Sequence, residues 1–458
     1  MNKIILFGTI LILTSGCLVG PKYSRPTTKE PKNYTQASEQ TDSITNLAWW
    51  EVYQDTILQN LIQVAIDSNN DLLAAVARVE ASRAVLGYSK ADLGPSIGYE
   101  AKARASDFRE NSSQAGVAFP NNSIALLGNV AWEIDIWGKV RHANRAAYAE
   151  LLASEEDKNS VYISLVAQVA ELYFNLRGLD ERLEITRKTY ESRKEFHRII
   201  QLRFEEGEVA ELDALQAEQL MAASEVQLYV IERDIIATEN ALNILLGQPY
   251  TMIERGLANE QQQLPVDIPS GLPSELLERR PDIRFAEQKL IAQTERIGVA
   301  VAMRFPSLSL TGFLGVASPE ISTLFDPSAY LGSVTGQLAG PLFQFGKNKR
   351  RVEIEQAVAK EYAYYYEQTV LYSFAEVENS LAEIRTYTNQ YRARSTQVAA
   401  NEKALMLSKA LYDNGYTSFL QVLDSERELF DSQLQQSLDL QNQLISVVRL
   451  YKALGGGW

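Results

Sequence analysis

Two long stretches of this chain contain no proline, one between positions 120 and 249 and one after position 341. Because proline breaks the interior of a helix, these stretches can form very long helices. Residues 139–206 are rich in Ala, Leu, Glu and Arg, and one nearly continuous helix over them would reach about 100 Å. Gly207 and Gly415 are the predicted turn points, because glycine adopts the positive φ that closes a helix. The sequence therefore predicts two long helical hairpins.

The same pattern occurs twice along the chain, which indicates an internal duplication. Matches run in order at an offset of 211 residues and then of 208. They include Asp71 with Asp282, Ala75 with Ala286, Gly87 with Gly298, Gly138 with Gly346, Gly207 with Gly415, Glu218 with Glu426, and Leu246 with Leu454. We predict a first repeat at 56–250 with its hairpin tip near 207, and a second at 251–458 with its tip near 415. An N-terminal extended segment at 17–55 precedes them.

Alternating apolar and polar residues predict two strands in each repeat. In "VAWEIDIWGKV", which begins at Val130, Trp132 and Ile134 alternate with Glu133 and Asp135 before a helical pattern starts at Lys139. The predicted strands cover about 96–106 and 123–137 in the first repeat, and about 306–317 and 329–343 in the second. A helix over about 56–93 precedes the first pair.

Composition disfavours nucleic-acid binding and gives no sign of an enzyme. The formal net charge is -14 and the pI is near 4.9, so no basic surface dominates. His142 and His197 are the only histidines, each alone on a helical tract, and the single Cys17 allows no disulfide or Cys-based metal site within one chain. No dinucleotide-binding or P-loop motif is present. We predict no catalytic residue, no metal site and no cofactor.

The first residues resemble a bacterial lipoprotein signal. A basic start, an apolar run at 4–13 and the small residues of "TSGC" form a secretory signal at 1–16, whose apolar run is too short to span a bilayer. By this resemblance Cys17 becomes the first mature residue and carries a covalent lipid, and Leu18 after it favours the outer membrane. Thr14 stands where such signals have Leu, so cleavage as an ordinary signal, leaving a free cysteine, is the alternative.

Four strands cannot close a membrane barrel alone, since small membrane barrels have about eight. A bilayer also forbids open strand edges, because unpaired backbone groups there cost several kcal/mol each. If the strands lie in a membrane, several chains must therefore share one barrel. Its predicted lumen face contains Glu100, Lys102, Arg104, Glu133 and Asp135, and its lipid face contains Trp132, Ile134 and Ile136. The alternative is a periplasmic helical scaffold or stalk without channel activity, in which the strands form a small soluble sheet.

Five motifs carry a resemblance to a known family. They are "CLVGPKYSRP" from Cys17, "AWWEVYQD" from Ala48, "LLERRPDIRFAEQKL" from Leu276, "FPSLSLTGFLG" from Phe305 and "GPLFQFGKNKRRVE" from Gly340. Through them the chain resembles the TolC-like outer-membrane efflux factors, lipoprotein branch. The resemblance implies a mainly α fold with a membrane β-barrel, in which a homotrimer supplies twelve strands and a long periplasmic α-helical barrel.

The function implied by this resemblance is a passive exit duct of a tripartite multidrug efflux pump in the outer membrane of a Gram-negative bacterium. Its implied partners are outer-membrane lipid, a periplasmic membrane-fusion adaptor and an inner-membrane transporter of the RND type.

The "RRPD" segment is interpreted as structural, with Pro281 in the first turn of a helix and Asp282 favourable at the positive helix end.

The residues implied to act are gates and contacts. Asp424, and with it Asp213, would form inward carboxylate rings that close the periplasmic end, where like charges repel and titrate together. The adaptor contacts at the helical tips would be Arg203, Gly207, Leu212, Gly415 and Leu420. The alternative for Asp424 is an ordinary solvated helix face, and any helical hairpin needs a glycine turn.

Overall fold

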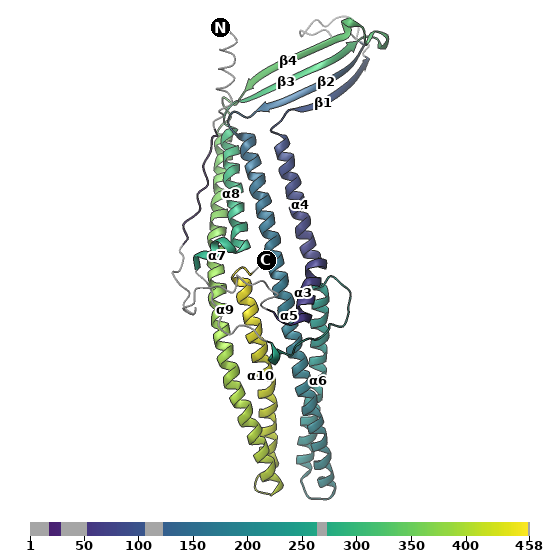
Figure 1. The fold of residues 1–458 in the computed structure, drawn as a ribbon, viewed down its shortest axis with the longest axis vertical. Helices are drawn as coiled ribbons and strands as arrows, with labels where there is room; N and C mark the ends of the chain where they lie inside the picture. The colour runs from purple at the N-terminus through teal and green to yellow at the C-terminus, as the bar shows by residue number, and fades with distance from the viewer. Residues whose placement is uncertain (1–17, 29–52, 106–121, 263–272, 457–458) are drawn as a thin grey trace. The chain divides into compact units, whose positions relative to one another are not determined.

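The computed structural model describes residues 18–28, 53–105, 122–262 and 273–456 (Figure 1). Cys17, the signal at 1–16 and most of the segment at 17–55 lie outside the described residues. The chain divides into two compact units. Unit 1 takes the described parts of 1–27, 78–155 and 285–367, and unit 2 takes those of 28–77, 156–284 and 368–458. Each unit therefore contains segments of both predicted repeats.

Unit 1 contains one antiparallel sheet of four strands in the order β1-β2-β3-β4 (Figure 1). The strands are β1 (Ser96–Ala105), β2 (Asn122–Ile134), β3 (Ser307–Ser318) and β4 (Tyr330–Ala339). The central pair, β2 and β3, joins the two repeats, with Val130 opposite Gly312. Strands β1 and β4 are the edges, and each pairs on one side only within the described chain.

The register of the strands sorts side chains by polarity. Ile97 lies opposite Val130, Val130 opposite Gly312 and Gly312 opposite Val334, so these residues share one face. The same alternation places on this face Tyr99, Leu126, Trp132, Leu314, Tyr330 and Leu338, all exposed. The opposite face is mostly polar and includes Glu100, Lys102, Arg104, Asn129, Glu133, Thr311, Thr335 and Gln337. The predicted two-sided strands are therefore in register with one another across both repeats.

Two predicted strand ends are wrong. The strand predicted at 123–137 ends at Ile134, because the Asp135 carboxylate accepts hydrogen bonds from the backbone N–H groups of Val140 (3.2 Å) and Arg141 (2.9 Å) at the start of α5 (Lys139–Glu205). Such a carboxylate at a helix N-terminus stabilises the helix. Asp135 and Ile136, predicted for the lumen and lipid faces, therefore belong to the turn after the strand.

The strand predicted at 329–343 ends at Ala339. Pro341 has no N–H to donate to a neighbouring strand, and Gly340 lies against Pro306, where a Cβ would clash. The chain then enters α9 (Lys347–Asp413) through Gly346, whose φ is +82°. The same turn precedes α5, where Gly138 has a φ of +81°.

The single helix predicted at 56–93 is two helices, α3 (Thr56–Ser68) and α4 (Asn70–Ala91). Asn69 separates them with an extended backbone. Its side-chain oxygen accepts a hydrogen bond from the N–H of Leu72 (3.0 Å), and its side-chain nitrogen donates to the carbonyl of Leu245 (2.9 Å). Asn69 therefore caps α4 and the end of α6 (Glu211–Leu245) together.

The two predicted hairpins are present and equal in length. Helices α5 and α9 each have 67 residues, and their return helices α6 and α10 (Phe419–Ala453) each have 35. Figure 1 shows each pair joined by a tight turn. The remaining elements are α7 (Pro273–Arg279), α8 (Pro281–Ala302) and the short 3₁₀ helices η2 (Asn259–Gln261), η3 (Ile321–Thr323) and η4 (Pro327–Ala329). In the part of the chain that the structure covers, no helix is long and apolar enough to cross a membrane.

The "RRPD" segment organises the start of α8 in unit 2. Pro281 is its first residue, as predicted. The buried Arg280 guanidinium pairs with Asp282 (2.6 Å) and Glu376 (2.7 Å), and it donates to the carbonyl of Ala453 (2.8 Å). This arginine thus ties α8 to α9 and α10, as expected of a structural motif.

Asp55 holds together three separate parts of unit 2. It is 1% exposed and caps α3 by accepting a hydrogen bond from the N–H of Ile57 (2.9 Å). Its carboxylate also accepts hydrogen bonds from the Tyr173 hydroxyl on α5 (2.7 Å), the Leu257 N–H (2.8 Å) and the Gln262 amide (3.0 Å). A buried carboxylate with this many donors fixes the relative positions of the segments that supply them.

We expect Asp55→Asn to destabilise the protein by about 3 kcal/mol at neutral pH, because an amide nitrogen cannot accept these hydrogen bonds. Burial acts to raise the pKa of Asp55, but the hydrogen bonds outweigh burial and the pKa is lowered overall. The carboxylate therefore stabilises the fold fully above the unfolded pKa of about 4, and this contribution is lost as the pH falls through the folded pKa.

The measurement is the Tm in detergent of the wild type and of Asp55→Asn between pH 3 and pH 7. The difference in Tm should shrink on the acid side. Asp67→Asn on the same helix is the control, because among the described residues the Asp67 side chain bonds only to Gln63 at the surface. A pH-independent difference, or an equal loss in the control, would contradict the role of Asp55.

Candidate functional site

The two helical tips have the same backbone geometry. After α5, the N–H of Gly207 bonds to the carbonyl of Phe204 (3.0 Å), and that of Glu208 to Arg203 (2.8 Å). After α9, the N–H of Gly415 bonds to Tyr412 (2.9 Å), and that of Tyr416 to Leu411 (2.8 Å). Gly207 and Gly415 have φ values of +77° and +75°. Both turns therefore end their helix in the pattern that requires a left-handed residue, as predicted.

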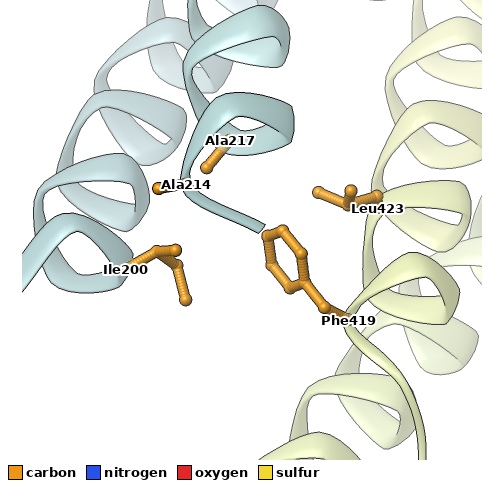
Figure 2. Packing of buried hydrophobic residues seen from close by; sticks show 5 residues of the cluster. All are labelled: Ile200, Ala214, Ala217, Phe419 and Leu423. Carbon is orange, nitrogen blue, oxygen red and sulfur yellow. The ribbon is translucent and has the colours of Figure 1, made fainter. Parts of the chain in front are cut away.

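An apolar cluster packs the tip of the first hairpin against the second. Figure 2 shows Phe419 of α10 pointing toward Ile200 of α5 and toward Ala214 and Ala217 of α6, with Leu423 one turn further along α10. All five side chains are buried. Partly buried neighbours are Phe196, Phe204, Val209, Leu220 and Tyr412. We call these ten residues the tip cluster.

Phe419 is central to the tip cluster. Its ring lies 5.4 Å from the ring of Phe196 and 5.5 Å from that of Tyr412, measured between centroids. Small residues at 214 and 217 let α6 approach the Phe419 ring closely. The position of each tip is therefore fixed by the other.

Among the predicted adaptor contacts, the two leucines face outward. Leu212 is 62% exposed and Leu420 is 55% exposed, at positions related by the repeat offset of 208. Gly207 and Gly415 are exposed, and a Cβ on either would meet nothing within 4 Å. Large exposed apolar groups around an open turn are what a contact surface requires.

Arg203 differs from the other predicted contacts, because it is half-buried and its charge acts on the hydroxyl of Tyr412 on the second hairpin. Tyr412 is desolvated and lies near Asp213, and both effects raise the pKa of its hydroxyl although Arg203 opposes them. Arg203 and Asp213 are thus brought together around Tyr412.

The predicted gate residue Asp424 carries an ion pair. Its carboxylate lies 3.0 Å from the guanidinium of Arg427, one turn along α10, and its side chain is 47% exposed. Asp213 lies on α6, in the first turn, and is half-buried. The two predicted carboxylates therefore have different surroundings. Asp424 on α10 is partly neutralised by Arg427, and Asp213 on α6 lies near Tyr412.

His142 has a structural environment. It is 2% exposed, with Nδ1 2.5 Å from the Glu295 carboxylate and Nε2 3.0 Å from the carbonyl of Val19. Over the described ranges, no group of three or more His, Cys, Asp and Glu side chains could hold a metal ion.

The chain matches the sequence model for "Outer membrane efflux protein" over residues 61–248 and 272–456, one stretch in each repeat. The chain belongs to this family. Its geometry above is therefore that of an outer-membrane efflux protein, with its helical part in the periplasm.

Similar proteins are known across nearly the whole length. The toluene efflux pump outer membrane protein TtgF of Pseudomonas putida is 32% identical over 460 residues, covering 98% of this chain and 95% of TtgF. The cation efflux system protein CusC of Escherichia coli is 30% identical over 461 residues, covering 100% and 99%. The crystal structure of the open state of the Neisseria gonorrhoeae MtrE outer membrane channel aligns with a TM-score of 0.86 at 27% identity, covering 96% of this chain and 98% of that one.

One buried ion pair of this outer membrane efflux protein escaped sequence reasoning. Arg193 on α5 and Glu426 on α10 are 3% and 5% exposed, and their charged atoms lie 3.4 Å apart. The guanidinium also donates to the carbonyl of Leu220 (3.2 Å) and lies over the ring of Phe430. Burial lowers the pKa of Arg193, and the charge of Glu426 opposes this effect. The repeat could not reveal the pair, because Glu218, the counterpart of Glu426, is exposed.

We expect Glu426→Gln to destabilise this efflux protein by about 3 kcal/mol, because it removes the carboxylate paired with the buried Arg193 cation and leaves only the charge of Asp431 to oppose its burial. Glu218→Gln removes the same charge from the equivalent exposed position and should change stability by less than about 0.5 kcal/mol. The Tm of each variant in detergent is the measurement. If both variants melt with the wild type, the pair does not hold the hairpins together.

Proposed function

We propose that this chain forms the outer-membrane exit channel of a tripartite efflux pump as a homotrimer, in which three four-stranded sheets close one barrel of twelve strands. The register of the sheet carries this proposal, because it gathers exposed apolar side chains of all four strands on one face and charged ones on the other. Membrane barrels alternate in the same way between lipid and a wet interior. A soluble scaffold would leave this apolar face in water.

The edges of the sheet support the sharing of one barrel between chains. Strands β1 and β4 each present a row of backbone groups without a partner in the described chain. In a bilayer these groups need strand partners, which the edge strands of neighbouring copies provide. Trp132 at the end of β2 suits the interface between lipid and water.

The tips of the two helical hairpins are the proposed binding surface for the partners. Exposed Leu212 and Leu420 at the two tips are contacts for a periplasmic adaptor, which connects the channel to an inner-membrane transporter of the RND type. The channel itself is passive, with no catalytic residue and no cofactor, and the transporter selects the cargo. A lipid on Cys17 anchors the chain in the outer membrane.

Asp424 is proposed as part of the periplasmic gate, together with Asp213. We expect Asp424→Ala to raise single-channel conductance in planar bilayers, because it removes one carboxylate per chain and the ion pair with Arg427. Glu428→Ala, at an exposed position one turn further along α10, is the matched control and should leave conductance unchanged. Equal conductance in the wild type and Asp424→Ala would remove Asp424 from the gate.

The adaptor contact predicts different results from two substitutions of Gly207. Asn tolerates the positive φ at this position, so Gly207→Asn should keep the turn and normal efflux. Gly207→Trp adds bulk at the exposed tip and should abolish efflux of a fluorescent substrate from cells while the amount in the outer membrane stays normal. Full efflux with Trp would refute the contact, and loss of efflux with Asn as well as with Trp would assign the glycine to the turn.

Cys17 is tested by metabolic labelling with a fatty acid. The wild type should incorporate the label and Cys17→Ser should not, because only the cysteine thiol can form the thioether to the lipid. If the wild type never incorporates the label, Cys17 is not lipidated and residues 1–16 are an ordinary secretory signal.

A further inference from the structure

A cavity of about 290 Å³ lies in unit 1 where the strands end and the helices begin. Glu133 of β2, Ser307 of β3 and Ala339 of β4 line it, and the first turns of α5 and α9 complete its wall. Ser307 lies opposite Ala339, and Glu133 lies opposite Ser309, so these residues all belong to the polar face of the sheet. The cavity therefore opens on the polar face.

The acidic side chains that line this cavity are already paired. The Glu133 carboxylate lies 2.6 Å from the Lys139 ammonium. The Asp135 carboxylate accepts a hydrogen bond from the N–H of Val140 and lies 3.1 Å from the Arg141 guanidinium. Neither carboxylate is left to neutralise a further cation.

Two further cations line the cavity and keep their charge. Lys347 and Arg351 lie one turn apart at the start of α9, and neither has a carboxylate partner among the described residues. The Arg351 guanidinium donates only to uncharged atoms, the Asn348 side-chain oxygen (3.0 Å) and the Met303 sulfur (3.4 Å). An ammonium has three donors and a guanidinium has five, so most of these donors stay open to an anion.

The rest of the polar face adds no free negative charge in the strands that the structure describes. Glu100 lies 2.7 Å from Lys102, and Arg104, two residues further along β1, has no carboxylate partner there. The chain as a whole has a formal net charge of -14, so this positive region is a local feature. A water-filled passage lined by charge of one sign concentrates ions of the opposite sign.

We propose that this cavity is an anion-binding site in the wall of the channel, and that Lys347 and Arg351 make this section of the channel favour small anionic solutes over cations. The inference rests on the proposed function, in which the polar face lines the wet interior. Lys347 is exposed and Arg351 is half-buried, so a bound anion keeps part of its water. Such binding is weak enough for the anion to leave again, as passage through a channel requires.

Trp137 is a local probe for this site, because it lines the cavity, stacks on Phe305 at 4.7 Å and is half-buried. Its emission is isolated by subtracting the spectrum of the same full-length protein with Trp137→Phe, in detergent. Iodide, an anionic quencher, should quench this emission about threefold more strongly in the wild type than in Lys347→Gln/Arg351→Gln, because the two cations concentrate it. Acrylamide, a neutral quencher, should quench both equally.

The matched control is Lys349→Gln/Arg350→Gln. It removes equal charge from side chains that pair with Glu353 and do not line the cavity, so iodide should quench Trp137 in it as in the wild type. Salt is a second control. At about 1 M the screening length falls to about 3 Å, and the difference between the wild type and Lys347→Gln/Arg351→Gln should shrink.

Two quenching results would overturn the proposal. Equal iodide quenching in the wild type and in Lys347→Gln/Arg351→Gln would remove the cavity as an anion site. An equal loss in the control variant would assign the effect to general surface charge.

The same variants separate this site from the channel itself. In planar bilayers, Lys347→Gln/Arg351→Gln should lower the permeability ratio of chloride to potassium about threefold, measured from the reversal potential in a salt gradient. An unchanged ratio in a protein that conducts would overturn the inference and leave the channel standing. A protein that shows the charge-dependent quenching without conducting would refute the channel and leave the anion site standing.

Discussion

Backbone hydrogen bonding at the two edges of the sheet is the constraint on which the rest of this structure depends. Four strands pair in the order β1-β2-β3-β4, so β1 and β4 each keep one side without a partner in the described chain. In a bilayer unpaired N–H and C=O groups cost several kcal/mol each. The apolar face through Ile97, Val130 and Val334 requires lipid, and lipid in turn requires closed edges. A sheet with both properties is complete only when copies of the chain join it.

The two helical hairpins follow the same duplicated plan as the sheet. Two hairpins of equal length end in turns of the same geometry, yet their side chains differ between the halves. Gln216 stands at the position of Asp424, and exposed Glu218 at that of buried Glu426. The duplication thus supplies a symmetric backbone, while contacts made by one half only, such as Phe419 in the tip cluster, fix the hairpins against each other. Any movement of one hairpin against the other must break these contacts.

Local sequence patterns predicted much of the fold. The absence of proline predicted the long helices, the glycines predicted both tips, and period-two alternation predicted four two-faced strands. The predicted ends of helices and strands were wrong where a side chain caps the next helix. Asn69 divides one predicted helix and Asp135 ends a predicted strand, because each bonds to backbone N–H groups of the next helix. Nothing in a short window of sequence shows that such a bond will form.

Contacts between residues far apart in the sequence could not be predicted either. Arg193 and Glu426 are separated by more than half of the chain, and only packing turns two ordinary surface residue types into a buried pair.

The most direct test of this account is the mass of the protein after chemical cross-linking in mild detergent, extracted from the outer-membrane fraction. The account predicts a mass close to three times the 51.3 kDa of one chain, because the open edges of β1 and β4 are closed by other copies. A monomer that remains stable and soluble without detergent would contradict it, since a closed barrel would then have no source of strands.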